Sequence, residues 1–259
     1  MSDAAPPTDD HRFAAWLAEA AGERLLAVRA EGLEGRELKD AGDAAAHELL
    51  VRLLAEHRPD DAVLSEEGSD DKARLSASRV WIVDPLDGTR EFSEPPREDW
   101  AVHVALWTDG ELVAGAVAQP ALGQTFHTGE PPVVPGLGDP QHRAGQRPRI
   151  AVSRSRPPAF VHALAEHLDA ELVPMGSAGV KMISVVRDVT DAYVHAGGQY
   201  EWDSAAPVAV ARASGLFTSR VDGSELVYNR DDVYLPDVIV CRPELSEPIL
   251  AFLAEHGWD

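Results

Sequence analysis

The chain opens with apolar residues spaced as in an amphipathic helix. From Phe13 to Val28 they recur every three or four positions, after a Thr-Asp-Asp segment suited to capping a helix. A similar spacing predicts a second helix that begins at Asp43 and ends before Pro59. Five short apolar runs then predict strands, so the first half is expected to place helices over a mostly antiparallel sheet. These runs lie at 61–65, 79–84, 100–107, 111–118 and 124–128.

A stretch rich in proline and glycine separates the two halves of the chain. Residues 130–148 show no hydrophobic period, which favours a linker or a long loop. Strand-like and helix-like runs alternate beyond it. The expected strands lie at 149–153, 191–196 and 237–241, and the expected helices at 159–168, 178–188, 203–215 and 244–257. We therefore expect an α+β domain over 1–148 and an α/β domain over 149–259.

The charge balance limits the classes of ligand. The 259 residues include 44 Asp and Glu against 23 Lys and Arg, a formal net charge of −21. Such a surface repels nucleic acid polymers and anionic membranes, because it lacks the basic patch that binds phosphate backbones. An anionic small molecule would need positive charge at its own site, and metal ions can supply it. Because Cys241 is the only cysteine and no apolar run has the length of a membrane span, we expect a cytoplasmic protein.

The segment WIVDPLDGT, Trp81–Thr89, ends an apolar run with two acids three positions apart. An Asp-Gly pair is common in plain turns, and that interpretation stays open for the segment alone. Pro85 fixes the backbone and lacks an N–H group, while Gly88 permits close approach of the backbone to a ligand. A helical turn that starts at DGT would present free N–H groups to an anion. The second interpretation is therefore a metal site that handles phosphate, with Asp84 and Asp87 as ligands.

Two further acids stand in similar positions. Glu66 follows an apolar run in LSEE, and Asp203 lies in EWDSAA where a helix is expected to begin. A plain helix N-cap is the alternative for Asp203. If these two met Asp84 and Asp87 in one pocket, each close pair of charges would repel by about 4 kcal/mol at 4 Å and an effective dielectric near 20. Such a cluster must bind protons or cations, and its oxygen ligands favour Mg²⁺, Mn²⁺ or Ca²⁺.

The motifs SEE, DPLDGT and WDSAA occur in this order along the chain. Together they resemble the signatures of the inositol monophosphatase superfamily of Mg²⁺-dependent, lithium-sensitive phosphatases, and the resemblance covers nearly the whole chain. It implies a layered α-β-α-β-α sandwich. It also implies two or three Mg²⁺ ions per site, with Mn²⁺ as a substitute and Li⁺ as an inhibitor. The metal ligands that it implies are Glu66, Asp84, the carbonyl of Leu86, Asp87 and Asp203.

The same resemblance implies catalytic and phosphate-binding roles. Gly88 and Thr89 would hold the phosphate through backbone N–H groups. Asp43 would act with the hydroxyl of Thr89 on the water that attacks phosphorus, and Glu66 would complete this catalytic group. The alternative for Asp43 is a helix N-cap.

Within the superfamily, DPLDGTREF resembles the DPLDGTKEF of CysQ-type 3′(2′),5′-bisphosphate nucleotidases, with Arg90 in place of a lysine. GSAGVKM resembles their Gly-Ser…Lys stretch. The implied reaction removes the 3′-phosphate of 3′-phosphoadenosine 5′-phosphate, or of its sulfated form, and recycles a by-product of sulfate assimilation. Arg90, Ser177 and Lys181 would contact this substrate, although a solvated lysine on a helix is the alternative for Lys181. A homodimer is expected by analogy only.

Other interpretations differ in substrate or in class. Inositol 1-phosphate and fructose 1,6-bisphosphate remain open as substrates of the same superfamily. A haloacid-dehalogenase-type phosphatase is excluded because it needs two aspartates at i and i+2. A non-catalytic module that binds a metal or a nucleotide would not need Asp43 beside Thr89. Histidines in predicted strands are expected in the core or at its rim rather than as ligands, namely His103, His127 and His195.

Overall fold

The computed structural model describes residues 6–139, 142–143 and 145–258. The helices of the described chain are α1 (Asp10–Arg29), α2 (Gly35–His57), α3 (Thr89–Phe92), α4 (Ala159–His167), α5 (Ala178–Val186), α6 (Glu201–Ala213) and α7 (Pro243–His256), with short 3₁₀ turns at Lys72–Ser76 and Pro120–Leu122. The strands are β1 (Ala62–Ser65), β2 (Arg79–Asp87), β3 (Ala101–Thr108), β4 (Glu111–Gln119), β5 (Gln124–His127), β6 (Arg149–Ser153), β7 (Glu171–Met175), β8 (Ala192–Ala196), β9 (Phe217–Ser219) and β10 (Asp237–Cys241).

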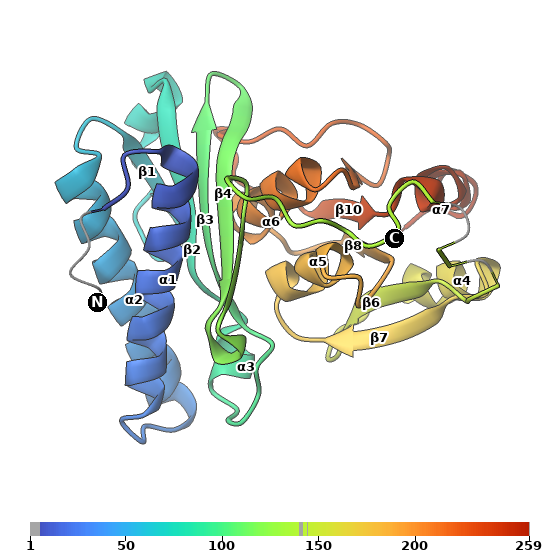
Figure 1. Ribbon diagram of the computed structural model, residues 1–259, viewed down its shortest axis with the longest axis horizontal. Helices are drawn as coiled ribbons and strands as arrows, with labels where there is room; N and C mark the ends of the chain where they lie inside the picture. Colours follow the sequence, from blue (N-terminus) through green and yellow to red (C-terminus); the bar gives the residue numbers. More distant parts are fainter. Residues whose placement is uncertain (1–5, 140–141, 144, 259) are drawn as a thin grey trace.

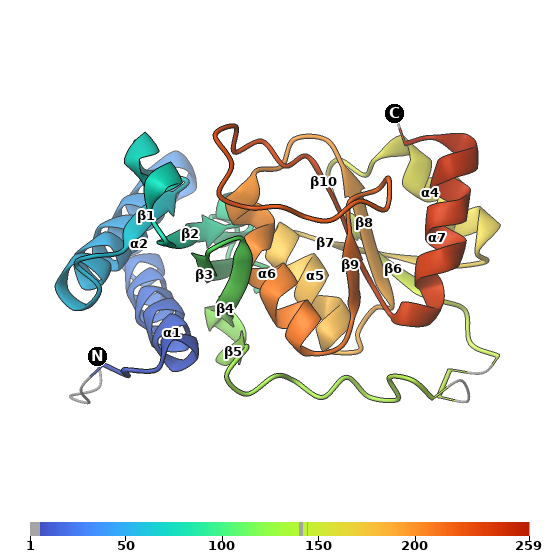
Figure 2. The same cartoon turned by 90° about the horizontal axis from the view of Figure 1, so that it is seen from above.

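The elements form five layers (Figures 1 and 2). Helices α1 and α2 cover the outer face of the first sheet, and α5 and α6 lie between the two sheets. Helices α4 and α7 cover the outer face of the second sheet. Three apolar clusters fill the spaces between these layers. The predicted α-β-α-β-α sandwich is therefore confirmed.

The two sheets differ in how their strands pair. The first has the order β1-β2-β3-β4-β5 and is antiparallel except for the β1–β2 pair, as the sequence predicted. The second has the order β7-β6-β8-β10-β9, in which β6 is parallel to both β7 and β8. The described part of the chain has no regular element between the end of β5 and the start of β6, where the linker is predicted. The division into two domains at 148/149 stays a prediction.

Strand β2, which lies between β1 and β3, is apolar on both faces, and the alternation of its side chains directs the candidate acids. Trp81 and Val83 pack with the α1/α2 cluster, whereas Val80 and Ile82 pack with the cluster of the middle layer. Successive side chains of a strand point to opposite faces, so Asp84 follows Val80 and Ile82 toward the middle layer. The period-2 pattern therefore turns this acid toward α5 and α6.

Helix α6 approaches the first sheet closely because small residues meet at the contact. A Cβ atom on Gly115 of β4 would lie 2.6 Å from Cβ of Ala209 and 3.1 Å from the carbonyl oxygen of Ala206. Only glycine fits at this position without a shift of the helix. This contact fixes the height of α6 above the sheet, and with it the position of Asp203.

Two expectations about elements are wrong or incomplete. Helix α2 begins at Gly35 rather than at Asp43, so Asp43 lies within the helix and is not its N-cap. The true N-cap, Glu34, makes no side-chain capping bond, and the polar first turns give no apolar stripe to mark the start. Strands β7 and β9 were not predicted, because β7 is an edge strand that contains Pro174 and β9 has three residues.

None of the described helices combines the length and the apolar character needed to cross a bilayer.

Candidate metal and phosphate site

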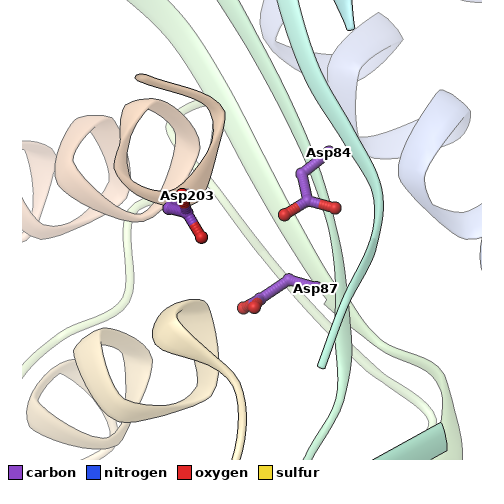
Figure 3. Close-up of side chains that lie close together, drawn as sticks. All are labelled: Asp84, Asp87 and Asp203. Carbon is purple, nitrogen blue, oxygen red and sulfur yellow. The ribbon is translucent and has the colours of Figure 1, made fainter. Parts of the chain in front are cut away.

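Three carboxylates from distant parts of the chain meet between β2 and α6 (Figure 3). Asp84 and Asp87 come from the end of β2, and Asp203 is the third residue of α6. Each offers one oxygen atom, and these atoms lie within 4.8 Å of one another. Pairing between β2 and β3 shifts register between Asp84 and Asp87, where Pro85 has no N–H group to donate. The irregularity lets two residues of one strand face the same site.

Glu66 joins this group from the end of β1. Its backbone N–H donates to the carbonyl of Val83 at 3.3 Å, which places it beside Asp84 on the neighbouring strand. Although the residue as a whole is exposed, its carboxyl group is close enough to Asp84 to share a hydrogen bond. The structure thus brings together all four acids that the sequence singled out. Their role as metal ligands stays a prediction.

The electrostatics of these acids fit a cation. Burial raises the pKa of Asp84 well above its usual range, and the charges of Glu66, Asp87 and Asp203 raise it further. Burial and the charge of Asp203 raise the pKa of Glu66 to about 7. Burial and the charge of Asp87 raise the pKa of Asp203 to about 6. Crowded carboxylates of this kind take up protons or hard cations, so the donor set fits Mg²⁺ or a similar ion.

Asp87 has a different environment from the other acids. Its Oδ1 accepts from the N–H of Ala178 at 3.1 Å and its Oδ2 from the N–H of Gly179 at 2.6 Å, both at the N-terminus of α5, and the Ser177 hydroxyl also donates to Oδ2. Burial alone would raise the pKa of Asp87, but the charge of His103 and the hydrogen bonds from the side chains of His103 and Ser177 lower it to about 2. Asp87 therefore stays ionised at neutral pH and joins the first sheet to α5.

His103 is the residue of this site that sequence reasoning missed as a functional neighbour. It is fully buried, as a core position requires, but its Nε2 lies 3.2 Å from Oδ2 of Asp87 and its Nδ1 lies 3.1 Å from the carbonyl oxygen of Trp202. Burial lowers the pKa of His103, yet the charge of Asp87 and its hydrogen bond raise it overall. A signal existed, because antiparallel pairing of the two predicted strands sets His103 opposite Asp84.

Asp43 and Thr89 meet as the family pattern implies. The Thr89 hydroxyl lies 3.4 Å from Oδ1 of Asp43 and 3.1 Å from the carbonyl oxygen of Leu86. Burial and the charge of Glu67 raise the pKa of Asp43 to about 7. Gly88, with φ of 85°, precedes the short helix α3 and adopts a backbone conformation that favours glycine. A helical turn does begin at DGT.

A cavity of about 410 Å³ adjoins the acids, and its volume lies in the range of small-molecule sites. Asp87 and Asp203 are among the residues that line it. The residues predicted to contact phosphate or substrate all line it, namely Gly88, Thr89, Arg90, Ser177 and Lys181. Contact with a substrate stays a prediction for each of them.

Lys181 is not a solvated lysine. It is 5% exposed, and its Nζ donates to the carbonyl of Ser177 at 2.6 Å and lies 3.4 Å from that of Gly176. Desolvation lowers its pKa, while the charges of Asp87 and other nearby acids raise it. The ammonium group therefore holds the turn before α5 and balances the charge of Asp87.

The alternative interpretation of Asp203 as a helix N-cap is also wrong. Tyr200 is the N-cap of α6, and it donates its N–H to Oδ2 of Asp203 at 2.7 Å.

A buried polar network links the segment after Glu66 to the start of α6. The guanidinium of Arg74, 1% exposed, donates to Asp70 at 2.6 and 2.9 Å and to Oδ1 of Asn229 at 2.7 Å. The carboxylate of Glu201 in turn accepts from the N–H groups of Asn229 and Arg230, both at 2.7 Å. The network therefore fixes the loop that carries Glu66 relative to the helix that carries Asp203.

The comparisons with known proteins agree with this geometry. The sequence profile of the inositol monophosphatase family matches residues 11–256. A Mycobacterium leprae protein named 3′-phosphoadenosine 5′-phosphate phosphatase is 48% identical, over 96% of this chain and 94% of its own length. An Escherichia coli 3′(2′),5′-bisphosphate nucleotidase CysQ is 32% identical over 75% and 81%.

A solved structure of a CysQ protein has the same fold as this chain. The crystal structure of CysQ from Bacteroides thetaiotaomicron superposes with a TM-score of 0.71 at 28% identity, covering 89% of this chain and 96% of that one. The resemblance drawn from the motifs SEE, DPLDGT and WDSAA is thus confirmed. The chain belongs to the inositol monophosphatase family.

Proposed function

We propose that the chain hydrolyses the 3′-phosphate of 3′-phosphoadenosine 5′-phosphate to give AMP and phosphate, and accepts its sulfated form as well. The observation that carries the proposal is a cluster of carboxylates, two of which line a cavity large enough for a nucleotide. Basic side chains also line the cavity, in an otherwise acidic protein, namely Arg90, Arg154, Arg156 and Lys181. The name of the 48% identical relative supports the same substrate.

The proposed chemistry needs divalent cations, which fit the donor set of Glu66, Asp84, Asp87, Asp203 and the carbonyl of Leu86. When bound there, Mg²⁺ would neutralise phosphate charge and make a water molecule more acidic. Thr89, in contact with Asp43, would orient the attacking water, and Asp43 would accept its proton. The backbone N–H groups of Gly88 and Thr89 would hold the phosphate in place. A non-catalytic binding module is disfavoured, because binding alone does not require the Asp43–Thr89 pair.

Removal and replacement of cations tests the chemistry. Protein treated with a chelator should release no phosphate, because the crowded acids then take up protons and leave the substrate charge unopposed. Mg²⁺ should restore the rate, Mn²⁺ should substitute for it, and millimolar Li⁺ should inhibit the Mg²⁺-loaded enzyme. Phosphate release measured at fixed ionic strength, with K⁺ as the control for Li⁺, gives the answer. Full activity in chelator, or indifference to Li⁺, would contradict the proposal.

Substrate preference is tested by comparing three phosphate esters under identical conditions. With Mg²⁺ present, kcat/KM for 3′-phosphoadenosine 5′-phosphate should exceed that for inositol 1-phosphate and fructose 1,6-bisphosphate by about tenfold or more. A site whose polar groups pair with one substrate leaves some of them unpaired with another, which lowers kcat/KM for the poorer substrate. A tenfold preference for inositol 1-phosphate would replace the nucleotidase proposal with an inositol monophosphatase. A preference for fructose 1,6-bisphosphate would replace it with a sugar phosphatase.

We infer a cytoplasmic enzyme and, by analogy with the family, a homodimer. A single buried cysteine, Cys241, is typical of proteins from reducing compartments. The proposed substrate is also an intracellular by-product of sulfate assimilation. Light scattering of the purified chain would measure its oligomeric state directly.

A further inference from the structure

The basic side chains of the cavity are mostly committed to partners within the protein. Arg154 donates from Nε to Glu91 and from its terminal nitrogen to Glu94, each at 2.7 Å. Arg90 lies 3.4 Å from the same Glu94. The ammonium group of Lys181 is buried beneath the turn before α5. The positive charge of these three residues is therefore largely balanced by neighbouring carboxylates or carbonyls.

Arg156 differs from them. It lines the cavity and is exposed, and its guanidinium makes no hydrogen bond or ion pair with the described residues. Its backbone is nevertheless held, because its N–H donates to the Ser153 hydroxyl at 3.2 Å and two prolines follow, Pro157 and Pro158. A guanidinium without a partner, on a turn whose backbone is held in place, can bind an anion at a small entropic cost.

The turn that carries Arg156 lies beside the candidate active site. Strands β6 and β7 are parallel and pair Ser153 with Met175, so the loops that follow them share one edge of the sheet. The N–H of Arg154 donates to the carbonyl of Met175 at 3.1 Å, which ties the two loops together. The loop after β7 continues into Ser177 at the start of α5, where Asp87 is bound. Arg156 therefore lines the same cavity as Asp87 and Asp203.

We propose that Arg156 binds the phosphate of the substrate that is not hydrolysed, and so determines the preference for bisphosphates over monophosphates. The inference rests on the proposed function. The two phosphates are attached to different carbons of the ribose, so when one lies at Asp84, Asp87 and Asp203 the other lies away from them. In a protein of net charge −21 it needs a positive group of its own. A guanidinium matches a phosphate with two parallel hydrogen bonds. Among the described residues that line the cavity, Arg156 is the arginine free to make them.

Steady-state kinetics of Arg156→Ala with two substrates tests the inference. The substrates are 3′-phosphoadenosine 5′-phosphate and adenosine 3′-monophosphate, which lacks the second phosphate. Loss of a charge-assisted bond should raise KM for the bisphosphate about tenfold or more, with kcat little changed and adenosine 3′-monophosphate unaffected. Arg156→Lys keeps the charge and should restore part of the affinity. Arg52→Ala removes another exposed arginine, from α2 and outside the cavity, and should behave as wild type.

The outcomes separate this inference from the proposed function. If the wild type prefers the bisphosphate and Arg156→Ala keeps that preference, another group binds the second phosphate and the inference is wrong. If Arg156→Ala impairs both substrates equally, Arg156 acts on their common part or on the fold, and the inference is also wrong. If the wild type hydrolyses neither nucleotide efficiently, the proposed function itself fails.

Discussion

Replacing Asp84 with asparagine should lower kcat by about a thousandfold or more on every phosphate substrate. Asp84 would hold a cation that stabilises the charge of the transition state by several kcal/mol. Asp84 is 1% exposed, and Glu66, Asp87 and Asp203 all act on it electrostatically. An asparagine keeps the size of the side chain and the bond from the N–H of Leu86, which is 3.0 Å long. It removes the charge that attracts a hard cation. Phosphate release with the nucleotide and with inositol 1-phosphate measures the loss.

The same substitution should not destabilise the metal-free protein. Burial and neighbouring acids raise the pKa of Asp84, so the folded state favours the protonated group and loses stability as pH rises through that pKa. An asparagine cannot ionise, and at neutral pH it avoids this cost. Thermal unfolding in chelator should therefore occur at the wild-type temperature or slightly above it. Asp109→Asn, on the exposed β3–β4 turn, is the matched control and should retain full activity. An active Asp84→Asn enzyme would refute the metal site.

Replacing Gly179 with alanine should both destabilise the fold and inactivate the enzyme. The added Cβ would lie 1.9 Å from Nε2 of His103 and 3.1 Å from Oδ2 of Asp87. His103 is fully buried and cannot move away, so the N-terminus of α5 must retreat from Asp87. Overpacking of this kind costs about 1–3 kcal/mol, and the lost bonds to Asp87 add to it. We expect a fall of about 2 kcal/mol or more in the free energy of unfolding and at least about a hundredfold loss of kcat/KM.

Two variants make this test specific. Gly68→Ala adds the same methyl group near the candidate site, but its nearest neighbour would be 3.4 Å away, an ordinary contact, so it should be tolerated. His103→Ala in the Gly179→Ala background removes the clashing ring and should recover part of the stability. Urea unfolding measures stability, and phosphate release measures activity. A Gly179→Ala protein with wild-type stability and rate would show that the contact between α5 and Asp87 is unimportant.

The sequence predicted much of the candidate site because several of its residues are close together in the chain. Asp84, Asp87, Gly88 and Thr89 lie within six positions, and their spacing relative to one proline is visible without any tertiary contact. The helical and strand periods likewise predicted most of the elements, since each element buries one apolar face or two, whereas the order of the layers came from the family resemblance. These patterns do not depend on how the two halves of the chain meet.

What the sequence did not reveal depends on contacts between residues far apart. Asp87 accepts from N–H groups more than 90 positions away, which turns a predicted metal ligand into a helix anchor as well. His103 stands in an apolar run and resembles an ordinary core residue until β2 and β3 are paired in register. The start of α2 was missed because its polar first turns carry no apolar stripe, and the error made Asp43 look like a helix cap.

The acids of the site come from two adjacent layers, with Asp84 on β2 of the first sheet and Asp203 on α6 of the middle layer. A cation bound by both residues would therefore exist only in the folded arrangement, and cation binding and unfolding become one linked equilibrium. Mass action then stabilises the fold by about 2.7 kcal/mol when free Mg²⁺ exceeds its dissociation constant a hundredfold. If Mg²⁺ is that cation, the lifetime of the protein against heat and proteases would depend on the magnesium concentration of its surroundings. Chelation would weaken the fold along with the catalyst.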